Sequence, residues 1–139
     1  MNKADGQPTE RIKSLRTFAA LKASLPIASG IADSVTASRK RSARVRGGKD
    51  PRLLVVVGPC SLHDDAAVLE YAERLAALSQ RVGYRLLLVM RAYVEKPRTT
   101  VGWKGLVYDP ALDGSGDMAE GLRRSRKLML KLLELGLPL

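Results

Sequence analysis

The sequence has few of the residues on which several protein classes depend. Its 139 residues include one cysteine, Cys60, which cannot form an internal disulfide, whereas small secreted domains usually rely on several such bridges. The longest apolar runs, Leu53–Val57 and Leu86–Met90, have five residues each, and a transmembrane helix needs about 20. The N-terminus has no apolar stretch that could be the core of a secretory signal. We therefore expect a cytoplasmic protein with a reduced thiol and no membrane partner.

Aromatic residues and histidine are also scarce. Aromatics make up 4% of the chain, and His63 is its single histidine. Aromatic rings are the usual stacking platforms for single-stranded nucleic acids, so their scarcity argues against nucleic acid as a partner. A closed structural zinc site needs four ligands, and no second pair exists to complete Cys60 and His63. We interpret His63 as a residue at the entry of a helix.

Positive charge is abundant and unevenly distributed. The formal net charge is +10; residues 1–50 hold eleven Lys or Arg against four Asp or Glu, and residues 51–139 hold thirteen against ten. Such an excess indicates an anionic partner, which could be nucleic acid, a membrane surface or phosphorylated metabolites. The basic stretch Arg39–Arg46 keeps a nucleic-acid-binding module open as an alternative function.

Apolar periodicity predicts a basic helical arm over residues 1–50 and two strand–helix units over residues 51–139, an α/β fold. Continuous apolar runs bounded by Gly and Pro are typical of strands in a parallel sheet, and spacing near 3.6 residues is typical of a helix. The predicted elements are a helix over Arg11–Leu25, a basic helix over Ser38–Lys49, strands Leu53–Val57 and Leu86–Met90, a helix over Asp64–Val82, and a helix from Asp117 to about Gly136.

Cys60 directly follows the first predicted strand. In α/β barrels and open α/β sheets, ligands bind at the carboxyl ends of the strands. A thiolate can bind Fe²⁺, Zn²⁺ or Mn²⁺ together with imidazole and carboxylate groups, so Cys60 is a candidate metal ligand. A lone cysteine is more often a small buried apolar side chain, and the residue types leave both interpretations open.

A cluster of cations follows the second predicted strand. Arg91, Lys96 and Arg98 lie within eight residues, and Thr99 follows at once. A guanidinium binds oxyanions bidentately, a lysine supplies a point charge or a proton, and a hydroxyl adds a neutral donor. Pro97 restricts the backbone of the residue before it. The loop is therefore suited to phosphate or carboxylate ligands, although a solvated basic loop remains an alternative.

Two segments resemble the class I 3-deoxy-7-phosphoheptulonate synthases. Residues Arg52–Asp64 read RLLVVVGPCSLHD, and residues Met90–Gly105 read MRAYVEKPRTTVGWKG. They occur in the order and at the spacing of that family, and the resemblance extends from about Arg52 to the C-terminus and more loosely through the N-terminal arm. The resemblance implies the N-terminal portion of a (β/α)8 TIM barrel and, by position, a role for Cys60 as a ligand of a divalent metal ion, Mn²⁺, Fe²⁺, Co²⁺ or Zn²⁺.

The same resemblance implies an activity and roles for the cationic loop. The family condenses phosphoenolpyruvate with erythrose 4-phosphate, a transferase reaction that is the first step of the shikimate pathway to aromatic amino acids. Arg91 and Lys96 would bind phosphoenolpyruvate, with Lys96 also placed for catalytic proton transfer. Arg98 and Thr99 would bind the phosphate of erythrose 4-phosphate, and Pro97 would line its sugar chain.

The chain is short for such an enzyme. A barrel of this kind needs about 250 residues, and in this family the remaining metal ligands, a His, a Glu and an Asp, come from later strands. We therefore expect the 139 residues to be a truncated piece that is inactive alone. The resemblance also implies a homo-oligomer inhibited by an aromatic amino acid, so a regulatory or oligomerisation fragment is a further alternative.

Overall fold

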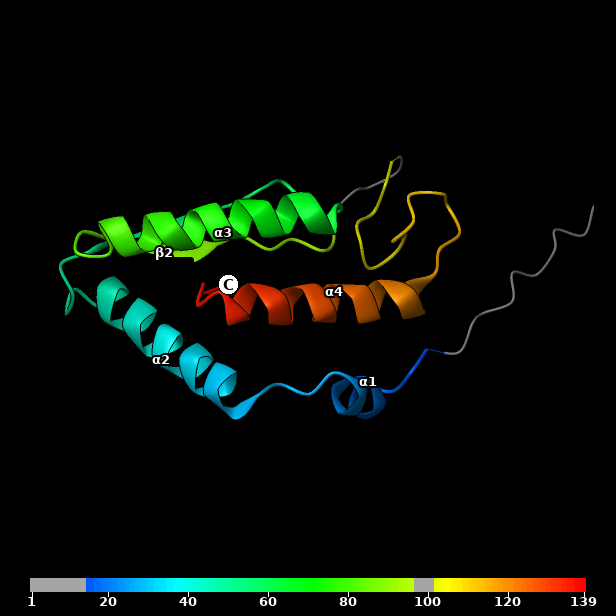
Figure 1. Ribbon diagram of the computed structural model, residues 1–139, viewed down its shortest axis with the longest axis horizontal. Coiled ribbons are helices and arrows are strands. Elements are labelled where there is room, and N and C mark those ends of the chain that lie inside the picture. Colours follow the sequence, from blue (N-terminus) through cyan, green and yellow to red (C-terminus); the bar gives the residue numbers. More distant parts are fainter. Residues whose placement is uncertain (1–14, 97–101) are drawn as a thin grey trace, which may run out of the picture.

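The computed structural model describes residues 15–96 and 102–139, and within these ranges the chain forms four helices and two strands (Figure 1). Their bounds, in chain order, are α1 Phe18–Ser24, α2 Ser29–Arg46, β1 Leu53–Val57, α3 Asp65–Val82, β2 Leu86–Met90 and α4 Met118–Glu134. The predicted α/β class is confirmed, as are the bounds of both strands. No helix in the described part of the chain is both long and apolar enough to cross a membrane.

The two strands form a parallel pair. Leu53 lies beside Leu86, and the register continues to Val57 beside Met90. The crossover between them is α3, which packs against β2. Since strands of a parallel pair run in the same direction, β1 and β2 end at the same edge, and the segments that follow them start side by side. This arrangement sets the position of the candidate site.

The helices that follow the strands begin at aspartate caps. The Asp64 carboxylate accepts a hydrogen bond from the Ala67 amide at 2.9 Å, and this bond is the main cause that lowers the pKa of Asp64 below its ordinary value. Asp117 accepts from the Glu120 amide at 3.1 Å in the same way. Side-chain acceptors at this position satisfy amide groups that the first turn leaves without partners. Both helix starts were predicted from these aspartates.

The N-terminal arm differs from its prediction in two places. The helix expected from Arg11 begins at Phe18, because Thr17 has an extended backbone and its hydroxyl accepts from the Ala20 amide as a cap; residues 11–14 of that prediction lie outside the described part. The second helix, α2, begins at Ser29 rather than Ser38 and ends at Arg46, with Gly47 as its C-cap residue. The division of the chain at residue 50 into an arm and a barrel segment stays a prediction.

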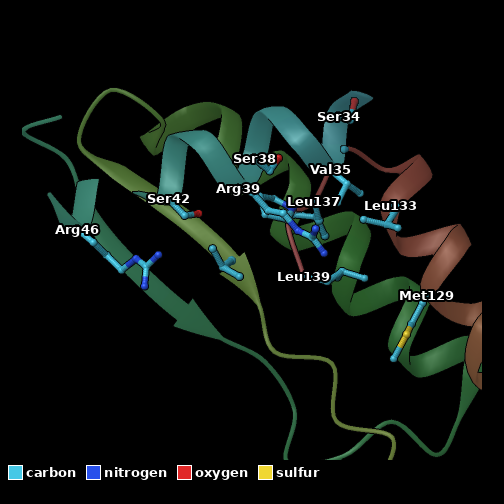
Figure 2. A pocket seen from close by; sticks show the side chains of 13 residues that line it. Ser34, Val35, Ser38, Arg39, Ser42, Arg46, Met129, Leu133, Leu137 and Leu139 are labelled. Carbon is cyan, nitrogen blue, oxygen red and sulfur yellow. The ribbon is translucent and has the colours of Figure 1, made fainter. Parts of the chain in front are cut away.

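Helix α2 contacts both β1 and α4. A cavity of about 610 Å³ opens between α2, the end of β2, the C-terminal half of α4 and the last residues of the chain. Figure 2 shows side chains of α2 and α4 on opposite sides of this space. The sheet face beside the cavity is therefore covered only in part.

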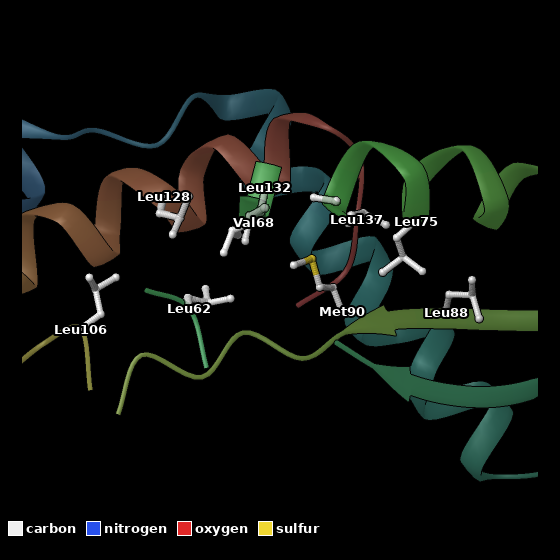
Figure 3. Close-up of a cluster of buried hydrophobic side chains, with 10 residues drawn as sticks. Leu62, Val68, Leu75, Leu88, Met90, Leu106, Leu128, Leu132 and Leu137 are labelled. Carbon is white, nitrogen blue, oxygen red and sulfur yellow. The ribbon is translucent and has the colours of Figure 1, made fainter. Parts of the chain in front are cut away.

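The apolar core lies on the other side of the sheet. It joins side chains of β2 to those of α3, α4 and the loops after each strand (Figure 3). Its buried members are Leu62, Val68, Ala72, Leu75, Leu88, Met90, Leu106, Leu128, Leu132 and Leu137. Because Leu62 and Leu106 come from the loops, the core fixes the segments that carry the candidate site as well as the helices.

Candidate functional site at the strand ends

The segments after β1 and β2 are held against each other at the point where the strands end. The Arg91 amide donates to the Val57 carbonyl at 2.9 Å. A side-chain carbon at Gly58 would lie 2.5 Å from the Arg91 carbonyl oxygen, which no real Cβ tolerates. Glycine is thus required at residue 58 for this close approach. The predicted juxtaposition of the two strand ends is present.

Lys96 reaches across from the second segment to Cys60 in the first. Its Nζ lies 3.2 Å from the cysteine Sγ, although the two residues are 36 positions apart in sequence. The backbone around Lys96 is fixed by its amide, which donates to the Lys104 carbonyl at 2.8 Å. The contact joins the segment after β2 to the single cysteine of the sequence, where the strands end.

Arg91 is held in one orientation by the first segment. Its Nε and Nη2 donate to the Pro59 carbonyl at 3.1 and 3.0 Å, and Nη2 also lies 3.3 Å from the Gly58 carbonyl oxygen. The guanidinium carbon lies 5.3 Å from the centroid of the Tyr93 ring, within cation–π range. The fixed guanidinium adds a second positive charge to the edge that carries Cys60.

Arg124 also belongs to this site, although no sequence pattern points to it. Its Nε donates to the Asp65 carboxylate at 2.9 Å, Nη1 to the Pro110 carbonyl at 2.6 Å and Nη2 to the His63 carbonyl at 3.2 Å. It thereby ties α4 to the start of α3 and to the long loop that precedes α4. Its partners are 14 to 61 positions away, and no local pattern encodes contacts of that range.

His63 and Trp103 pack together beside this segment. Their ring centroids lie 6.2 Å apart in an edge-to-face arrangement, and the Trp103 indole donates to the Asp109 carbonyl at 2.8 Å. His63 is exposed and lies at the entry to α3, as predicted. These contacts anchor the loop that returns from the cationic segment.

The structure brings together three of the six predicted site residues. Cys60, Arg91 and Lys96 converge at the strand ends; the other three, Pro97, Arg98 and Thr99, lie outside the described residues. Within residues 15–96 and 102–139, no three His, Cys, Asp or Glu side chains lie close enough together to hold a metal ion. The roles assigned to all six residues stay predictions.

These features define an α/β protein with parallel strands and a cationic, thiol-bearing candidate site at the carboxyl ends of those strands, where ligands of α/β proteins bind. The sequence matches the DAHP synthetase I family over residues 28–138. The chain therefore belongs to this family, as its two sequence signatures predicted.

Named relatives agree with this assignment. The chain is 58% identical over 138 residues to the Trp-sensitive phospho-2-dehydro-3-deoxyheptonate aldolase of Enterobacter agglomerans and 51% identical to that of Escherichia coli K12. Each alignment covers 99% of this chain and 40% of the relative. A solved phospho-2-dehydro-3-deoxyheptonate aldolase from Francisella tularensis SCHU S4 is 43% identical with a TM-score of 0.88, covering 93% of this chain and 38% of the other. The chain thus spans about two fifths of the length of these relatives.

Proposed function

We propose that this chain forms the N-terminal part of a 3-deoxy-7-phosphoheptulonate synthase, a transferase that condenses phosphoenolpyruvate with erythrose 4-phosphate and releases phosphate. The observation that carries the proposal is the 3.2 Å contact between Lys96 Nζ and Cys60 Sγ at the ends of two parallel strands. It joins a candidate metal ligand to a candidate acid–base group. In the complete protein, the two strand–helix units would be the first of a (β/α)8 barrel.

The charge of this edge suits the proposed substrates. Both are phosphate esters, and phosphoenolpyruvate also carries a carboxylate, so they repel each other. Arg91 is held by a carbonyl oxygen of the segment that carries Cys60, and Lys96 contacts Cys60 of the same segment. Fixed cations that bring two anions together lower the entropic and the electrostatic cost of their reaction. Arg98 and Thr99 would extend the same surface towards erythrose 4-phosphate, with Pro97 beside its sugar chain.

A divalent metal ion is part of the proposal. Cys60 is exposed at the strand end, and its sulfur lies beside the Lys96 ammonium group; cysteine sulfur is a common ligand of divalent metal ions. The described residues offer one ligand of the set, so the others would come from the part of the relatives' length that this chain does not span. Bound there, the ion would supply Lewis-acid polarisation of the aldehyde.

An aromatic amino acid as feedback inhibitor and assembly into a homo-oligomer belong to the same proposal. The names of the relatives specify tryptophan for the Enterobacter agglomerans protein and tyrosine for an Escherichia coli protein that is 53% identical over 125 residues. Both amino acids should therefore be assayed. A cytoplasmic location belongs to the proposal as well, because the relatives bear the names of biosynthetic enzymes that act on small phosphorylated metabolites.

The proposal is tested by completing the chain. Leu139 is joined to the region of the Enterobacter agglomerans protein that follows its matched part, and phosphate release is measured with both substrates. We expect activity that requires phosphoenolpyruvate and erythrose 4-phosphate together, and none from the 139 residues alone. Chelation with EDTA should abolish the activity, and added Mn²⁺ should restore it.

Single variants of the fused protein test the named residues. Lys96→Ala should lower kcat/KM by about 100-fold or more, the usual contribution of a positioned acid–base group. Cys60→Ala should weaken Mn²⁺ binding. Lys127→Ala, which removes the same charge from an exposed position of α4, is the control and should leave kcat/KM unchanged. Full activity of the Lys96→Ala protein would contradict the role proposed for this residue.

A further inference from the structure

Three segments of the chain meet at the candidate site. The cysteine segment, residues 58–64, follows β1 and carries Cys60, and the lysine segment, residues 91–96, follows β2 and carries Lys96. The returning loop, residues 104–117, leads into α4. The strand ends fix only the first residues of the cysteine and lysine segments. Beyond the strands, the relative positions of Cys60 and Lys96 depend on contacts among the three segments.

Backbone hydrogen bonds join the lysine segment to both of the others. The Leu62 amide of the cysteine segment donates to the Tyr93 carbonyl at 2.8 Å. The Lys96 amide donates to the Lys104 carbonyl of the returning loop at 2.8 Å. The lysine segment is therefore bonded to the cysteine segment near one of its ends and to the returning loop near the other.

Arg124 of α4 joins the two remaining segments to each other. Its Nη2 donates to the His63 carbonyl of the cysteine segment at 3.2 Å, and its Nη1 donates to the Pro110 carbonyl of the returning loop at 2.6 Å. With the backbone bonds, these contacts form a closed ring that runs from the cysteine segment through the lysine segment and the returning loop back to its start. In a closed ring each segment is held from two directions, which restricts its movement more than an open series of contacts does.

The third contact of Arg124 contributes less to this ring. Its Nε lies 2.9 Å from the Asp65 carboxylate, but the two side chains are 27% and 46% exposed, and ion pairs at such exposure add little to stability. Pro110, in contrast, is buried. A buried carbonyl that loses its donor is costly, so the contact with Pro110 should matter more than the contact with Asp65.

The apolar core supports the ring but does not replace it. Leu62 of the cysteine segment and Leu106 of the returning loop are fully buried, in the same cluster as Leu128 of α4 (Figure 3). Apolar burial is non-directional, whereas a hydrogen bond requires a narrow range of distance and angle. The core therefore holds the two segments close to α4, and the guanidinium of Arg124 sets where their backbones lie along it.

We propose that Arg124 is a positioning residue of the candidate site, because it closes the ring of segments that keeps Lys96 Nζ within 3.2 Å of Cys60 Sγ. Arg124 acts through the backbone carbonyls of His63 and Pro110. The inference rests on the proposed function for the reaction that the site performs, but the ring itself requires no substrate.

The kinetic test uses the fused protein with Arg124→Met. Methionine keeps much of the length of the side chain and favours a helix, but it removes the three contacts. We expect kcat/KM to fall by about tenfold or more, mainly through kcat, because a small displacement of reacting groups lowers the rate strongly. Arg123→Met is the matched control and should leave kcat/KM unchanged, since this neighbouring arginine pairs with Glu120 on the exposed surface of α4.

Two further variants separate positioning from stability. Asp65→Asn removes the ion pair alone and should change kcat/KM by less than about twofold. Leu75→Ala weakens the core within α3 away from the ring, so it should lower the melting temperature and keep kcat at a temperature where the protein is folded. Loss of kcat in Leu75→Ala as large as in Arg124→Met would overturn the proposal, and so would an equal loss in Asp65→Asn or Arg123→Met.

Amide hydrogen exchange of the 139-residue chain tests the ring without activity. NMR should show the Leu62 and Lys96 amides exchanging about tenfold or more faster in Arg124→Met than in the original chain, because opening the ring permits local unfolding. The Arg91 amide, which is bonded to β1 through Val57, should be unaffected.

The exchange result separates this inference from the proposed function. Unchanged exchange in Arg124→Met, or no protection of the Leu62 amide in the original chain, would overturn the positioning role even if the fused protein is active. Faster exchange at both amides together with an inactive fused protein would support the ring and contradict the proposed function.

Discussion

At the scale of single residues, an ion pair fixes the turn that leads into β1. Asp50 accepts from Arg52 through Oδ1 at 3.0 Å and Oδ2 at 2.7 Å, and Arg52 also donates to the Gly83 carbonyl at 3.2 Å. The hydrogen bonds from the Arg52 side chain are the main cause that lowers the pKa of Asp50 from 3.8 to about 2. The pair joins the turn before β1 to the turn after α3.

This pair predicts an acid-dependent part of the stability. Because the folded pKa of Asp50 lies below the unfolded one, its contribution is complete above about pH 4 and is lost as the pH falls through about 2. Asp50→Asn should therefore lower the melting temperature at pH 7, and the difference from the original chain should shrink steadily as the pH is lowered from about 4 to about 2. Thermal unfolding followed by circular dichroism at several pH values measures this. Asp33→Asn, which removes an exposed charge on α2, is the control, and an equal pH dependence in that variant would contradict the prediction.

At the scale of elements, the first turn of α4 packs directly against the backbone of the loop before it. A side-chain carbon at Gly121 would overlap the Val107 carbonyl, whereas at Gly30, near the start of α2, nothing lies within 4 Å. Two glycines in helices are thus under opposite constraints. The first permits a close approach between helix and backbone, and the second has open space around it.

Alanine substitutions at the two glycines should therefore have opposite effects on the free energy of unfolding. Gly121→Ala forces α4 away from the loop and should cost about 1–3 kcal/mol, the usual range for overpacking. Gly30→Ala should be neutral or stabilising by up to about 1 kcal/mol, since alanine loses less conformational entropy. Urea denaturation followed by circular dichroism compares them. Equal destabilisation by both would mean that helix position, and not the contact with Val107, determines the cost.

The elements themselves were predictable because their signals are local. The apolar runs Leu53–Val57 and Leu86–Met90 became strands with the predicted bounds, and Asp64 and Asp117 marked the starts of two helices. The helix bounds in the N-terminal arm were harder to predict, because the apolar periodicity of this segment is weak. The cap formed by Thr17 and the start of α2 at Ser29 came from the structure.

The candidate site was predictable to the extent that topology alone determines it. Parallel strands end at one edge, so the meeting of the Cys60 and Arg91 segments followed from the predicted order of elements. The contact of Lys96 with Cys60, and the anchoring of three segments by Arg124, depend on the course of loops. Loop paths are set by long-range packing, which the local sequence does not encode.

At the scale of the whole molecule, the second half of α2 forms a dense group of exposed cations. Arg39, Lys40, Arg41, Arg44 and Arg46 of α2 are all exposed, and the first 50 residues carry most of the net charge of +10. Such a surface attracts polyanions without sequence preference, and salt screens the attraction because the Debye length is about 10 Å at 0.1 M. Such non-specific attraction explains why the sequence suggests nucleic-acid binding, and it does not require that nucleic-acid binding is the function.

The distribution of charge, and not only its sum, should govern binding to a polyanion. Lys40→Gln/Arg44→Gln removes two charges from α2, and Lys127→Gln/Lys131→Gln removes two from exposed positions of α4. The net charge of the two variants is equal, so a column of immobilised heparin compares position alone. The α2 variant should elute at lower salt than the α4 variant, because closely spaced cations act on one stretch of polymer together. Elution of both at the same salt concentration would show that the chain binds through its net charge and that α2 has no special part in the interaction.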